Sequence, residues 1–358
     1  MMRKTVLACA CLLLPALSMA ADPALPAVDA VVAEVVGQDA PGIAVLVSEN
    51  GEIRHLKGYG LADLEAEIPV SPDTLFDLAS VSKQMTALAA AILIEEGTLT
   101  LDTEVRSLIK SFDVADENRP VTVGDLVFHL AGLPDYWNQM EGYGHKTDNA
   151  AVVEWLSGMP LLRAPGTHYE YSNSAYLLLG STIAAADGAA DLRAVLNTRV
   201  WQPLGMKSTG LVSAPAGVAT TRLAKGYKGS EGEFEPSRFD SLVQGDGSVL
   251  SSVRDLALYE AALVNGDLLE DTDQLFVNGS YDNGEAIDDG DGAQAGYGFG
   301  WSLYTRNGQR YAGHAGSWMG TATYYQRNLD SGISVIVLAN GEDASTQSLA
   351  EAIEDALE

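Results

Sequence analysis

Apolar positions along this chain recur with two different spacings, and the change of spacing separates a middle part from two ends. Near the N-terminus, residues 42–48 are rich in β-branched side chains, and the turn Glu49-Asn50-Gly51-Glu52 leads on to residues 53–60. Two such runs joined by an Asn-Gly turn predict a β-hairpin. Strand patterns return near the C-terminus, over residues 297–305, 318–327 and 333–340.

Helical spacing dominates the middle of the chain. The segments with this spacing are separated by turn residues and cover 80–96, 122–131, 149–157, 174–186, 189–202 and 253–265. Two further helices are predicted at the ends, over 28–36 and 345–357. Strands at both ends with helices between them favour an α/β (α+β) fold, in which an antiparallel sheet flanked by terminal helices receives an inserted helical domain.

The predicted domain boundaries follow from this division. Residues 1–20 are predicted to be a signal peptide, residues 21–78 and 290–358 the α/β sheet domain, and residues 79–289 the mostly helical insert. A cleft between two such domains is the natural position for an active site.

The first residues have the pattern of a secretory signal. Arg3 and Lys4 precede an apolar run over residues 5–17, and Ser18-Met19-Ala20 offers small residues for cleavage. We therefore expect cleavage after Ala20 and a periplasmic or secreted protein. The apolar run is too short to cross a bilayer, and no later segment has the ~18 unbroken apolar residues of a membrane helix, so no membrane span is predicted.

Charge and cysteine content exclude several kinds of partner and chemistry. The 358 residues include 49 acids and 21 bases, a net charge of −28, which disfavours nucleic acid as a partner. Solubility is the simplest explanation of this charge, and steering of a cationic substrate is the alternative. Both cysteines, Cys9 and Cys11, lie in the predicted signal, so the mature chain has no disulfide or cysteine nucleophile. The five histidines are scattered, and without cysteines they offer no convincing zinc set.

Residues 270–292 form a polar segment rich in acids and without a base. Calcium binding is one interpretation, because carboxylate oxygens suit that ion. The spacing of these acids matches no calcium-binding loop, and a solvated acidic loop is the favoured interpretation.

Ser80-Val81-Ser82-Lys83 is the first candidate for chemistry. If Ser80 lies in the first turn of the helix predicted over 80–96, the i,i+3 spacing puts its hydroxyl and the Lys83 amine on one face. A serine alcohol is a poor nucleophile until a neighbour accepts its proton, and a lysine accepts only as a neutral amine, which burial favours. Alone, the same spacing also describes ordinary surface pairs.

Tyr171-Ser172-Asn173 and Gly313-His314-Ala315-Gly316-Ser317 are the second and third candidates. A phenolate beside a lysine can act as a base, and an amide can orient a carbonyl group. Small residues ahead of the strand predicted from Trp318 let a substrate approach, and the backbone N–H of Ser317 could point at an oxyanion. Taken separately, the first is equally a buried tyrosine with a capping pair, and His314 is equally an ordinary loop histidine.

In this order the three motifs resemble the serine β-lactamase and penicillin-binding-protein superfamily, in particular its branch of class C β-lactamases, D-peptidases and related esterases. The resemblance extends over nearly the whole chain after the predicted signal. It includes residues 75–76, 95–102, 128–136, 203–206, 224–227 and 245–255. The fold of that family, a helical domain inserted into an α/β sheet domain, agrees with the fold predicted from the pattern.

The resemblance implies acyl transfer, with Ser80 as the nucleophile and Lys83 and Tyr171 sharing the proton transfers. It also implies that Asn173 orients the substrate and contacts Lys83, while His314 and Gly316 border the substrate. The backbone N–H groups of Ser80 and Ser317 would form the oxyanion hole. The chemistry that the resemblance implies needs neither a metal nor an organic cofactor.

For several aromatic and polar residues the sequence allows two roles, lining the active site or packing within the fold. His129 and Asp135-Tyr136 match a loop that borders the cleft in this family, and a packed turn explains them equally well. Trp318 and Tyr297 either line the pocket or pack on the sheet, and packing is the favoured interpretation.

His314 departs from class C β-lactamases, which carry a lysine at this position. Lysine is a cation for a substrate carboxylate, whereas histidine is largely neutral at pH 7. Histidine here resembles D-alanyl-D-alanine carboxypeptidases and D-aminopeptidases, so the sequence favours a serine hydrolase of D-amino-acid-containing peptides or related amides. The alternatives are a carboxylesterase on the same fold, a class C-like β-lactamase and a slowly turning-over penicillin-binding sensor. The expected partner is a small-molecule or peptide substrate, and a monomer is the default state.

Overall fold

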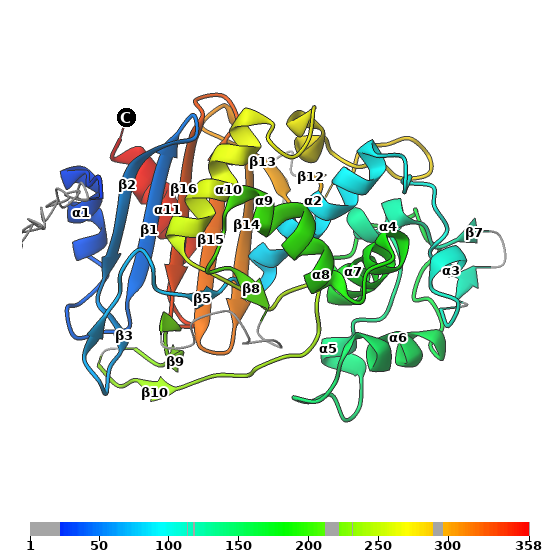
Figure 1. Cartoon of the computed structure of the whole chain (residues 1–358), viewed down its shortest axis with the longest axis horizontal. Coiled ribbons are helices and arrows are strands. Elements are labelled where there is room, and N and C mark those ends of the chain that lie inside the picture. The colour runs from blue at the N-terminus through cyan, green and yellow to red at the C-terminus, as the bar shows by residue number, and fades with distance from the viewer. Residues whose placement is uncertain are drawn as a thin grey trace, which may run out of the picture.

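A seven-stranded antiparallel sheet forms one side of the molecule, and helices α3 to α8 (within residues 105–196) lie on the other side (Figure 1). The computed structural model describes residues 22–112, 114–116, 119–211, 222–230, 232–288 and 296–357. The strand order is β12-β13-β14-β15-β16-β1-β2, so the N-terminal hairpin joins the C-terminal strands through the pair β1–β16. The strands span Ile43–Glu49 (β1), Glu52–Tyr59 (β2), Gly296–Tyr297 (β12), Ser302–Arg306 (β13), Gln309–Trp318 (β14), Thr321–Asn328 (β15) and Ile333–Ala339 (β16). The predicted α/β (α+β) class, with one sheet built from both ends of the chain, is confirmed.

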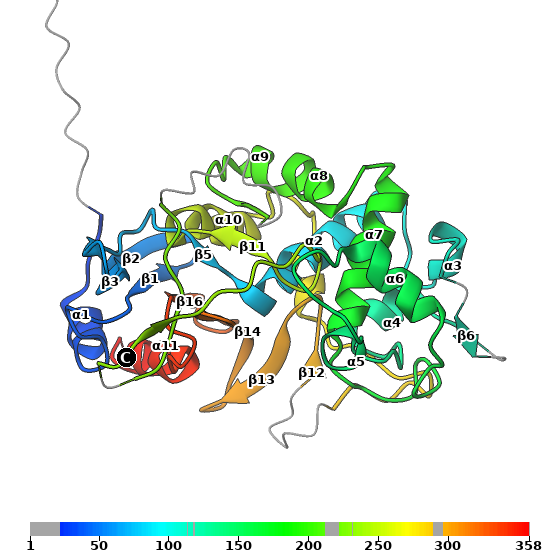
Figure 2. The same cartoon turned by 90° about the horizontal axis from the view of Figure 1, so that it is seen from below.

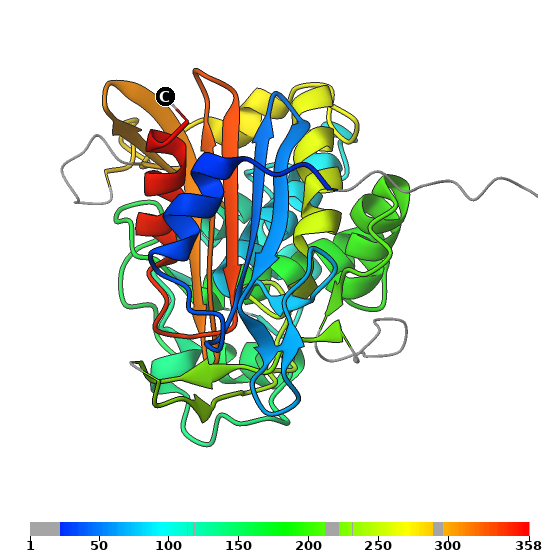
Figure 3. The same cartoon turned by 90° about the vertical axis from the view of Figure 1, so that its left-hand side faces the viewer.

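Helices cover both faces of this sheet, which explains why its middle strands are apolar on both sides. On one face α11 (Thr346–Asp355) packs against β15 and β16, and α1 (Pro26–Ala33) packs against α11 (Figure 3). On the other face α10 (Val253–Asn265) packs against β1 and β2. Side chains of β1 alternate accordingly: Val45 joins the core under α1 and α11, and Leu46 joins the core on the opposite face.

The position of α10 differs from the domain division drawn from the sequence, which puts residues 79–289 in the helical insert. This helix contacts the sheet, and so does the 3₁₀ turn η1 (Ala79–Val81), which packs against β14 and β15. Both elements therefore lie with the sheet. Apolar spacing shows that a helix buries one face, but it carries no information on which layer that face meets.

The remaining helices surround α7 (Figure 2), which contacts α2, α3, α4, α5, α6 and α8. Because neighbours cover it all round, α7 is apolar along almost its whole length. These elements are α2 (Ser82–Glu95), α3 (Val105–Leu108), α4 (Val123–Val127), α5 (Tyr136–Gln139), α6 (Asn149–Ser157), α7 (Asn173–Asp187), α8 (Leu192–Leu196), the π-helical turn η2 (Asn197–Trp201), α9 (Gln202–Leu204) and the 3₁₀ turn η4 (Thr272–Phe276). The helix predicted over 189–202 is thus divided into α8 and η2, with α9 after them.

Short strands form four smaller sheets within the described residues. A three-stranded sheet, in the order β5-β11-β8, brings the segment before η1 beside residues 249–251. Its strands are Phe76–Asp77 (β5), Gly210–Leu211 (β8) and Val249–Ser251 (β11). Two-stranded pairs are formed by Leu61–Asp63 (β3) with Ile68–Pro69 (β4), Ala115–Asp116 (β6) with Arg119–Pro120 (β7), and Tyr227–Lys228 (β9) with Glu235–Pro236 (β10).

Two helices begin and end at the residues that the sequence predicts, α6 and α10. Each starts after a capping side chain: Asp148 accepts a hydrogen bond from the Ala151 N–H at 3.0 Å, and Ser252 accepts one from the Asp255 N–H at 3.2 Å. α10 ends at Gly266, whose φ of 71° is the left-handed conformation that glycine adopts without strain.

The strand predicted over 318–327 is wrong at its start. The structure has β14 over Gln309–Trp318, then a turn, then β15, so the third motif lies within a strand and not ahead of one. Glycine inside a strand usually counts against it. Here a Cβ on Gly316 would come within 2.4 Å of the Leu78 carbonyl oxygen, so this glycine lets the segment that enters η1 lie directly on the sheet.

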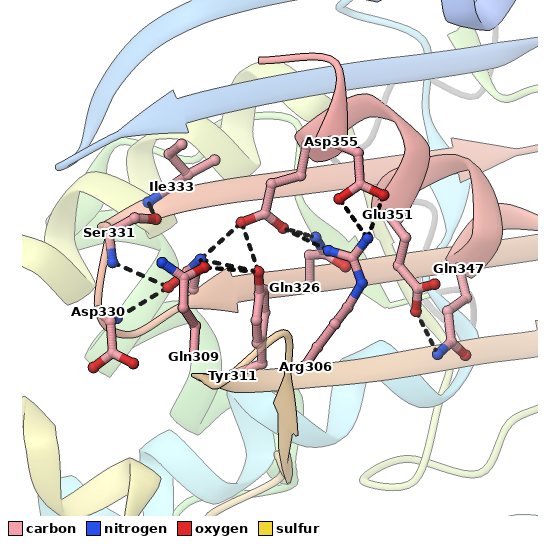
Figure 4. A network of polar contacts seen from close by, with 12 residues as sticks. Arg306, Gln309, Tyr311, Gln326, Asp330, Ser331, Ile333, Gln347, Glu351 and Asp355 are labelled. Atoms are coloured by element: carbon pink, nitrogen blue, oxygen red, sulfur yellow. Dashed lines mark hydrogen bonds and ion pairs between the residues drawn. The ribbon is translucent and has the colours of Figure 1, made fainter. Parts of the chain in front are cut away.

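A buried polar network fixes α11 on the sheet (Figure 4). The Glu354 carboxylate, 1% exposed, accepts hydrogen bonds from Tyr311 at 3.0 Å, Gln326 at 2.5 Å and Asn328 at 2.9 Å. Arg306 donates a hydrogen bond to the carboxylate of Asp355, the residue that follows Glu354. Buried carboxylates are tolerated when donors surround them in this way.

The predicted signal peptide, residues 1–20, lies outside the described residues. Among the helices that the structure describes, none is both long and apolar enough to cross a membrane.

Candidate active site

Ser80 lies in the 3₁₀ turn η1, between β5 and the first turn of α2. The sequence predicts Ser80 in the first turn of the α-helix. In the structure this turn is a 3₁₀ turn, and the α-helix begins two residues later, at Ser82. Ala79, directly before it, has a φ of 47°, a left-handed conformation that is unusual for a residue with a side chain. The Asp77 carboxylate accepts a hydrogen bond from the Ala79 N–H at 2.8 Å, which stabilises this bend. The strained turn projects Ser80 into a cavity of about 450 Å³.

Lys83 is fully buried and makes three hydrogen bonds. Its Nζ lies 3.2 Å from the Ser80 Oγ, 3.0 Å from the Asn173 Oδ1 and 2.7 Å from the Asp246 carbonyl oxygen. An ammonium donates to all three acceptors. A neutral amine would donate to the amide and the carbonyl and accept the Ser80 proton, so the geometry suits proton transfer from the alcohol.

Tyr171 and Asn173 approach the same amine from the start of α7. Lys83 Nζ lies 4.9 Å from the centre of the Tyr171 ring, which is 40% exposed. Asn173 is held at its backbone, because its N–H donates to the Asp135 carboxylate at 2.8 Å. Ser172 caps the helix by accepting from the Ala175 N–H at 3.2 Å. The structure therefore brings together the four predicted residues Ser80, Lys83, Tyr171 and Asn173.

His314 lies on β14 beside Tyr171, with the two ring centres 6.0 Å apart. Its Nδ1 lies 2.7 Å from the Ala315 carbonyl oxygen and must donate there, so in the neutral ring Nε2 accepts from the Tyr297 hydroxyl at 3.0 Å. Burial lowers the pKa of His314 to about 3, and the positive charge of Lys83 acts in the same direction. His314 is thus a buried neutral group, and it is not among the described residues that line the cavity.

Gly316 and Ser317 lie opposite Ser80. Ser317 lines the same cavity as Ser80, as an oxyanion hole made from their two N–H groups requires. Gly316 faces the Leu78 carbonyl oxygen, and Thr323 donates a hydrogen bond to that oxygen at 2.8 Å. Gly316 therefore acts here by letting η1 and β14 approach each other.

Asp246 also belongs to the site, although it lies in none of the three sequence motifs. Its carbonyl oxygen binds Lys83, and its carboxyl group, 8% exposed, accepts from the Tyr136 hydroxyl at 2.6 Å. Burial raises the pKa of the Asp246 carboxyl group, against the opposing effect of the Lys83 charge. The signal available in the sequence is an acid between two glycines, Gly245 and Gly247, in a segment that resembles the family.

Aromatic residues surround the site on two sides. Trp137 and Trp318, with ring centres 4.5 Å apart, line the cavity, so Trp318 belongs to the pocket and not to sheet packing alone. Behind Tyr171, the His129 ring lies 4.5 Å from it and 4.6 Å from the Tyr297 ring. His129 accepts from the Ser172 N–H at 3.0 Å, which links the loop of residues 128–136 to the start of α7.

Within the described residues, no three His, Cys, Asp or Glu side chains gather as a metal site. In the segment 270–292, Asp282 forms an ion pair with Arg119 at 2.8 Å. The calcium interpretation gains no support from the part of this segment that is described, residues 270–288.

A serine on a strained turn, a buried lysine 3.2 Å away and an antiparallel strand passing the serine define the class: a serine acyl-transfer site on a β-lactamase/transpeptidase-like fold. The chain belongs to the Beta-lactamase family, whose model matches residues 28–358.

Three curated relatives extend the comparison. Penicillin-binding protein 4* of Bacillus subtilis (strain 168) is 31% identical over 84% of this chain and 68% of its own length. Esterase EstB of Burkholderia gladioli is 36% identical over 55% of this chain and 52% of its own length. D-aminopeptidase of Brucella anthropi is 29% identical over 86% of this chain and 57% of its own length. The chain thus spans about half to two thirds of the relatives that it matches.

Among solved structures, the octameric penicillin-binding protein homologue from Pyrococcus abyssi resembles this chain with a TM-score of 0.77 and 26% identity. The match covers 92% of this chain and 75% of the other. The family and fold expected from the three motifs are therefore confirmed.

Proposed function

We propose that this chain is a serine hydrolase that works through an acyl-enzyme and cleaves D-amino-acid-containing peptides or related amides. The observation that carries the proposal is the Lys83 amine, held by Asn173 and Asp246 and 3.2 Å from the Ser80 hydroxyl. Similarity to a D-aminopeptidase and to a penicillin-binding protein supports the substrate class.

In the acylation step the Ser80 Oγ forms a bond to the substrate carbonyl carbon while its proton passes to Lys83. The carbonyl electrons move onto oxygen, where the N–H groups of Ser80 and Ser317 stabilise the charge; one such donor contributes about 2.7–4 kcal/mol in a comparable hydrolase. When the carbonyl re-forms, the C–N bond breaks and the leaving amine takes a proton from the Lys83–Tyr171 pair.

Deacylation repeats these steps with water. Water attacks the ester carbon, its proton passes to the same pair, and the Ser80–carbon bond breaks as Ser80 recovers a proton. An amine that arrives before water would give transfer instead of hydrolysis.

A carboxylesterase is the second candidate, because the chain is 36% identical to Esterase EstB over the matched region. The same residues would act in the same order, and an ester is cleaved more easily than an amide because resonance stabilises its carbonyl group less. A class C-like β-lactamase is disfavoured, because His314 is buried and neutral where those enzymes present a lysine cation. A slowly turning-over penicillin-binding sensor is the further alternative, and the lifetime of the acyl-enzyme distinguishes it.

The experiment uses four probes: a fluorescent penicillin, a 4-nitrophenyl ester, a D-Ala-D-Ala peptide and a D-alanine 4-nitroanilide. We expect turnover of the anilide or the peptide, a covalent mass on Ser80 and complete loss of both in Ser80→Ala. The control is Ser230→Ala, which removes an exposed hydroxyl outside the cavity. Ester turnover alone would select the second candidate, and full activity of Ser80→Ala would refute the nucleophile.

Export through the predicted signal is part of the same proposal, with cleavage after Ala20 and a periplasmic or secreted mature chain. A monomer is proposed as its solution state. Intact mass of the protein from cell fractions tests the first statement, and light scattering tests the second.

A further inference from the structure

The cavity at Ser80 is lined by four acids and, among its described lining residues, by no base. The acids are Asp77, Asp246, Glu342 and Asp343. The basic residues outside the described part of the chain are Arg3 and Lys4, both in the predicted signal. The potential inside this cavity is therefore negative, and a substrate carboxylate would meet repulsion there.

Two cations beside the cavity are already engaged. Lys83 donates to three acceptors beneath Ser80. Arg238 lies in the neighbouring small pocket that shares Asp77 with the cavity, and it is paired with Asp240 at 2.6 Å. Neither neutralises Glu342 or Asp343.

Glu342 and Asp343 are held in place by their own hydrogen bonds, as binding groups need to be. The Glu342 Oε2 accepts from the Ser237 hydroxyl and the Gly320 N–H, each at 2.6 Å. The Asp343 Oδ2 accepts from the Gly229 N–H at 2.9 Å. In both carboxylates the second oxygen makes no hydrogen bond within the described chain, so it is left for a ligand.

The position of the cavity indicates which part of the substrate it holds. Asn173 and Ser317 line it, whereas Tyr171 and His314 do not. The leaving group must take a proton from the Lys83–Tyr171 pair, so it lies on the Tyr171 side of Ser80. The cavity with the acids then receives the acyl part, and the rings of Trp137 and Trp318 favour an alkyl chain with a positive end.

We propose that the acyl part of the substrate carries a cationic group, an ammonium or guanidinium remote from the scissile carbonyl, which Glu342 and Asp343 bind. This rests on the proposed function for the reaction and adds to it the charge class of the substrate. Part of the net charge of −28 would then serve to attract a cationic substrate, in addition to keeping the protein soluble.

A binding test separates this inference from the catalytic proposal. Ser80→Ala protein is titrated with n-hexylammonium, hexanol and hexanoate at low ionic strength, and the fluorescence of the cavity tryptophans is followed. We expect the ammonium to bind about tenfold more tightly than hexanol, the usual scale of one such ion pair, and hexanoate more weakly than either. Salt should reduce the preference. Equal binding of all three would overturn the inference even if turnover is found.

A kinetic test uses 4-nitroanilides of D-lysine and D-norleucine, which differ in the charged end of the side chain. We expect a kcat/KM ratio of about tenfold in favour of D-lysine, falling towards one in Glu342→Gln with Asp343→Asn. Glu235→Gln, an exposed acid on β10 outside the cavity, is the matched control and should leave the ratio unchanged. A ratio that survives the double substitution would overturn the assignment of these two residues. Absence of anilide turnover would count against the proposed amidase function, while the titration still decides the charge preference.

Discussion

At the scale of single residues, the site depends on how one amine is surrounded. Lys83 has no exposed surface, and its three acceptors come from η1, from α7 and from the segment before β11. Two of these partners follow from the motifs, because Ser80 is one turn away and Asn173 belongs to the second motif. The third, Asp246, is 163 positions from Lys83 along the chain, and its place between two glycines is the only local sign of it.

Lys83→Arg separates the charge of this residue from its ability to accept a proton. A guanidinium remains protonated, so it can keep the positive charge but cannot take the Ser80 proton. We expect acylation by an activated ester to slow about 10²–10⁴-fold, the usual contribution of a positioned base. Stopped-flow measurement of the acylation burst tests this, with the exposed Lys225→Arg as control. Acylation at the wild-type rate would assign the base to Tyr171 alone.

At the scale of elements, the sequence predicts helices better than it predicts the strand that carries the third motif. α6 and α10 are predicted to the residue because caps and glycines mark their ends in the local sequence. β14 is missed because Gly313 and Gly316 resemble a loop, and the reason for Gly316 lies far away in the chain, at the Leu78 carbonyl oxygen. Long-range contact, and not local preference, decides that segment.

Gly316→Ala tests the close approach of η1 and β14. The new Cβ would lie 2.2 Å from the Thr323 Oγ1 and 2.4 Å from the Leu78 oxygen, so η1 has to move and Ser80 moves with it. We expect a loss of about 1–3 kcal/mol in unfolding free energy, together with at least tenfold slower acylation. Urea unfolding and burst kinetics measure the two effects.

Ala315→Ser, on the exposed side of the same strand, is the control for Gly316→Ala. Its unfolding free energy should lie within about ±0.5 kcal/mol of the wild-type value. If Gly316→Ala behaved in the same way, the packing of η1 on β14 would be looser than described.

At the scale of the whole molecule, histidines buried without charge make the fold sensitive to acid. Burial lowers the pKa of His55 to about 4 and that of His314 to about 3, and it lowers the pKa of His129 well below the usual 6.5. The unfolded chain binds protons at these positions from about pH 6.5 downwards, and the folded chain does not. Asp77 and Asp246 act the other way, because burial raises the pKa of both carboxyl groups, that of Asp77 to about 6.

We therefore expect the unfolding free energy to fall as the pH is lowered from about 7 to about 4, because the three histidines with depressed pKa values outweigh the two carboxyl groups with raised pKa values. Urea midpoints at pH 7.5, 6 and 5 measure the slope. His55→Gln should flatten it, and the exposed His168→Gln should not. A midpoint that stays constant over this range would contradict the expectation.

The pairing of β1 with β16 has a consequence for how the protein is made. Ile43 lies opposite Ala339 and Ser48 opposite Ser334. Within the sheet, β1 near the start of the chain therefore pairs with β16 near its end. The ribosome must synthesise almost the entire polypeptide before β1 and β16 can pair. Until then the apolar edge of the N-terminal hairpin stays unpaired. A nascent chain cut short before residue 333 should consequently remain bound to chaperones or precipitate, whereas the completed chain can fold.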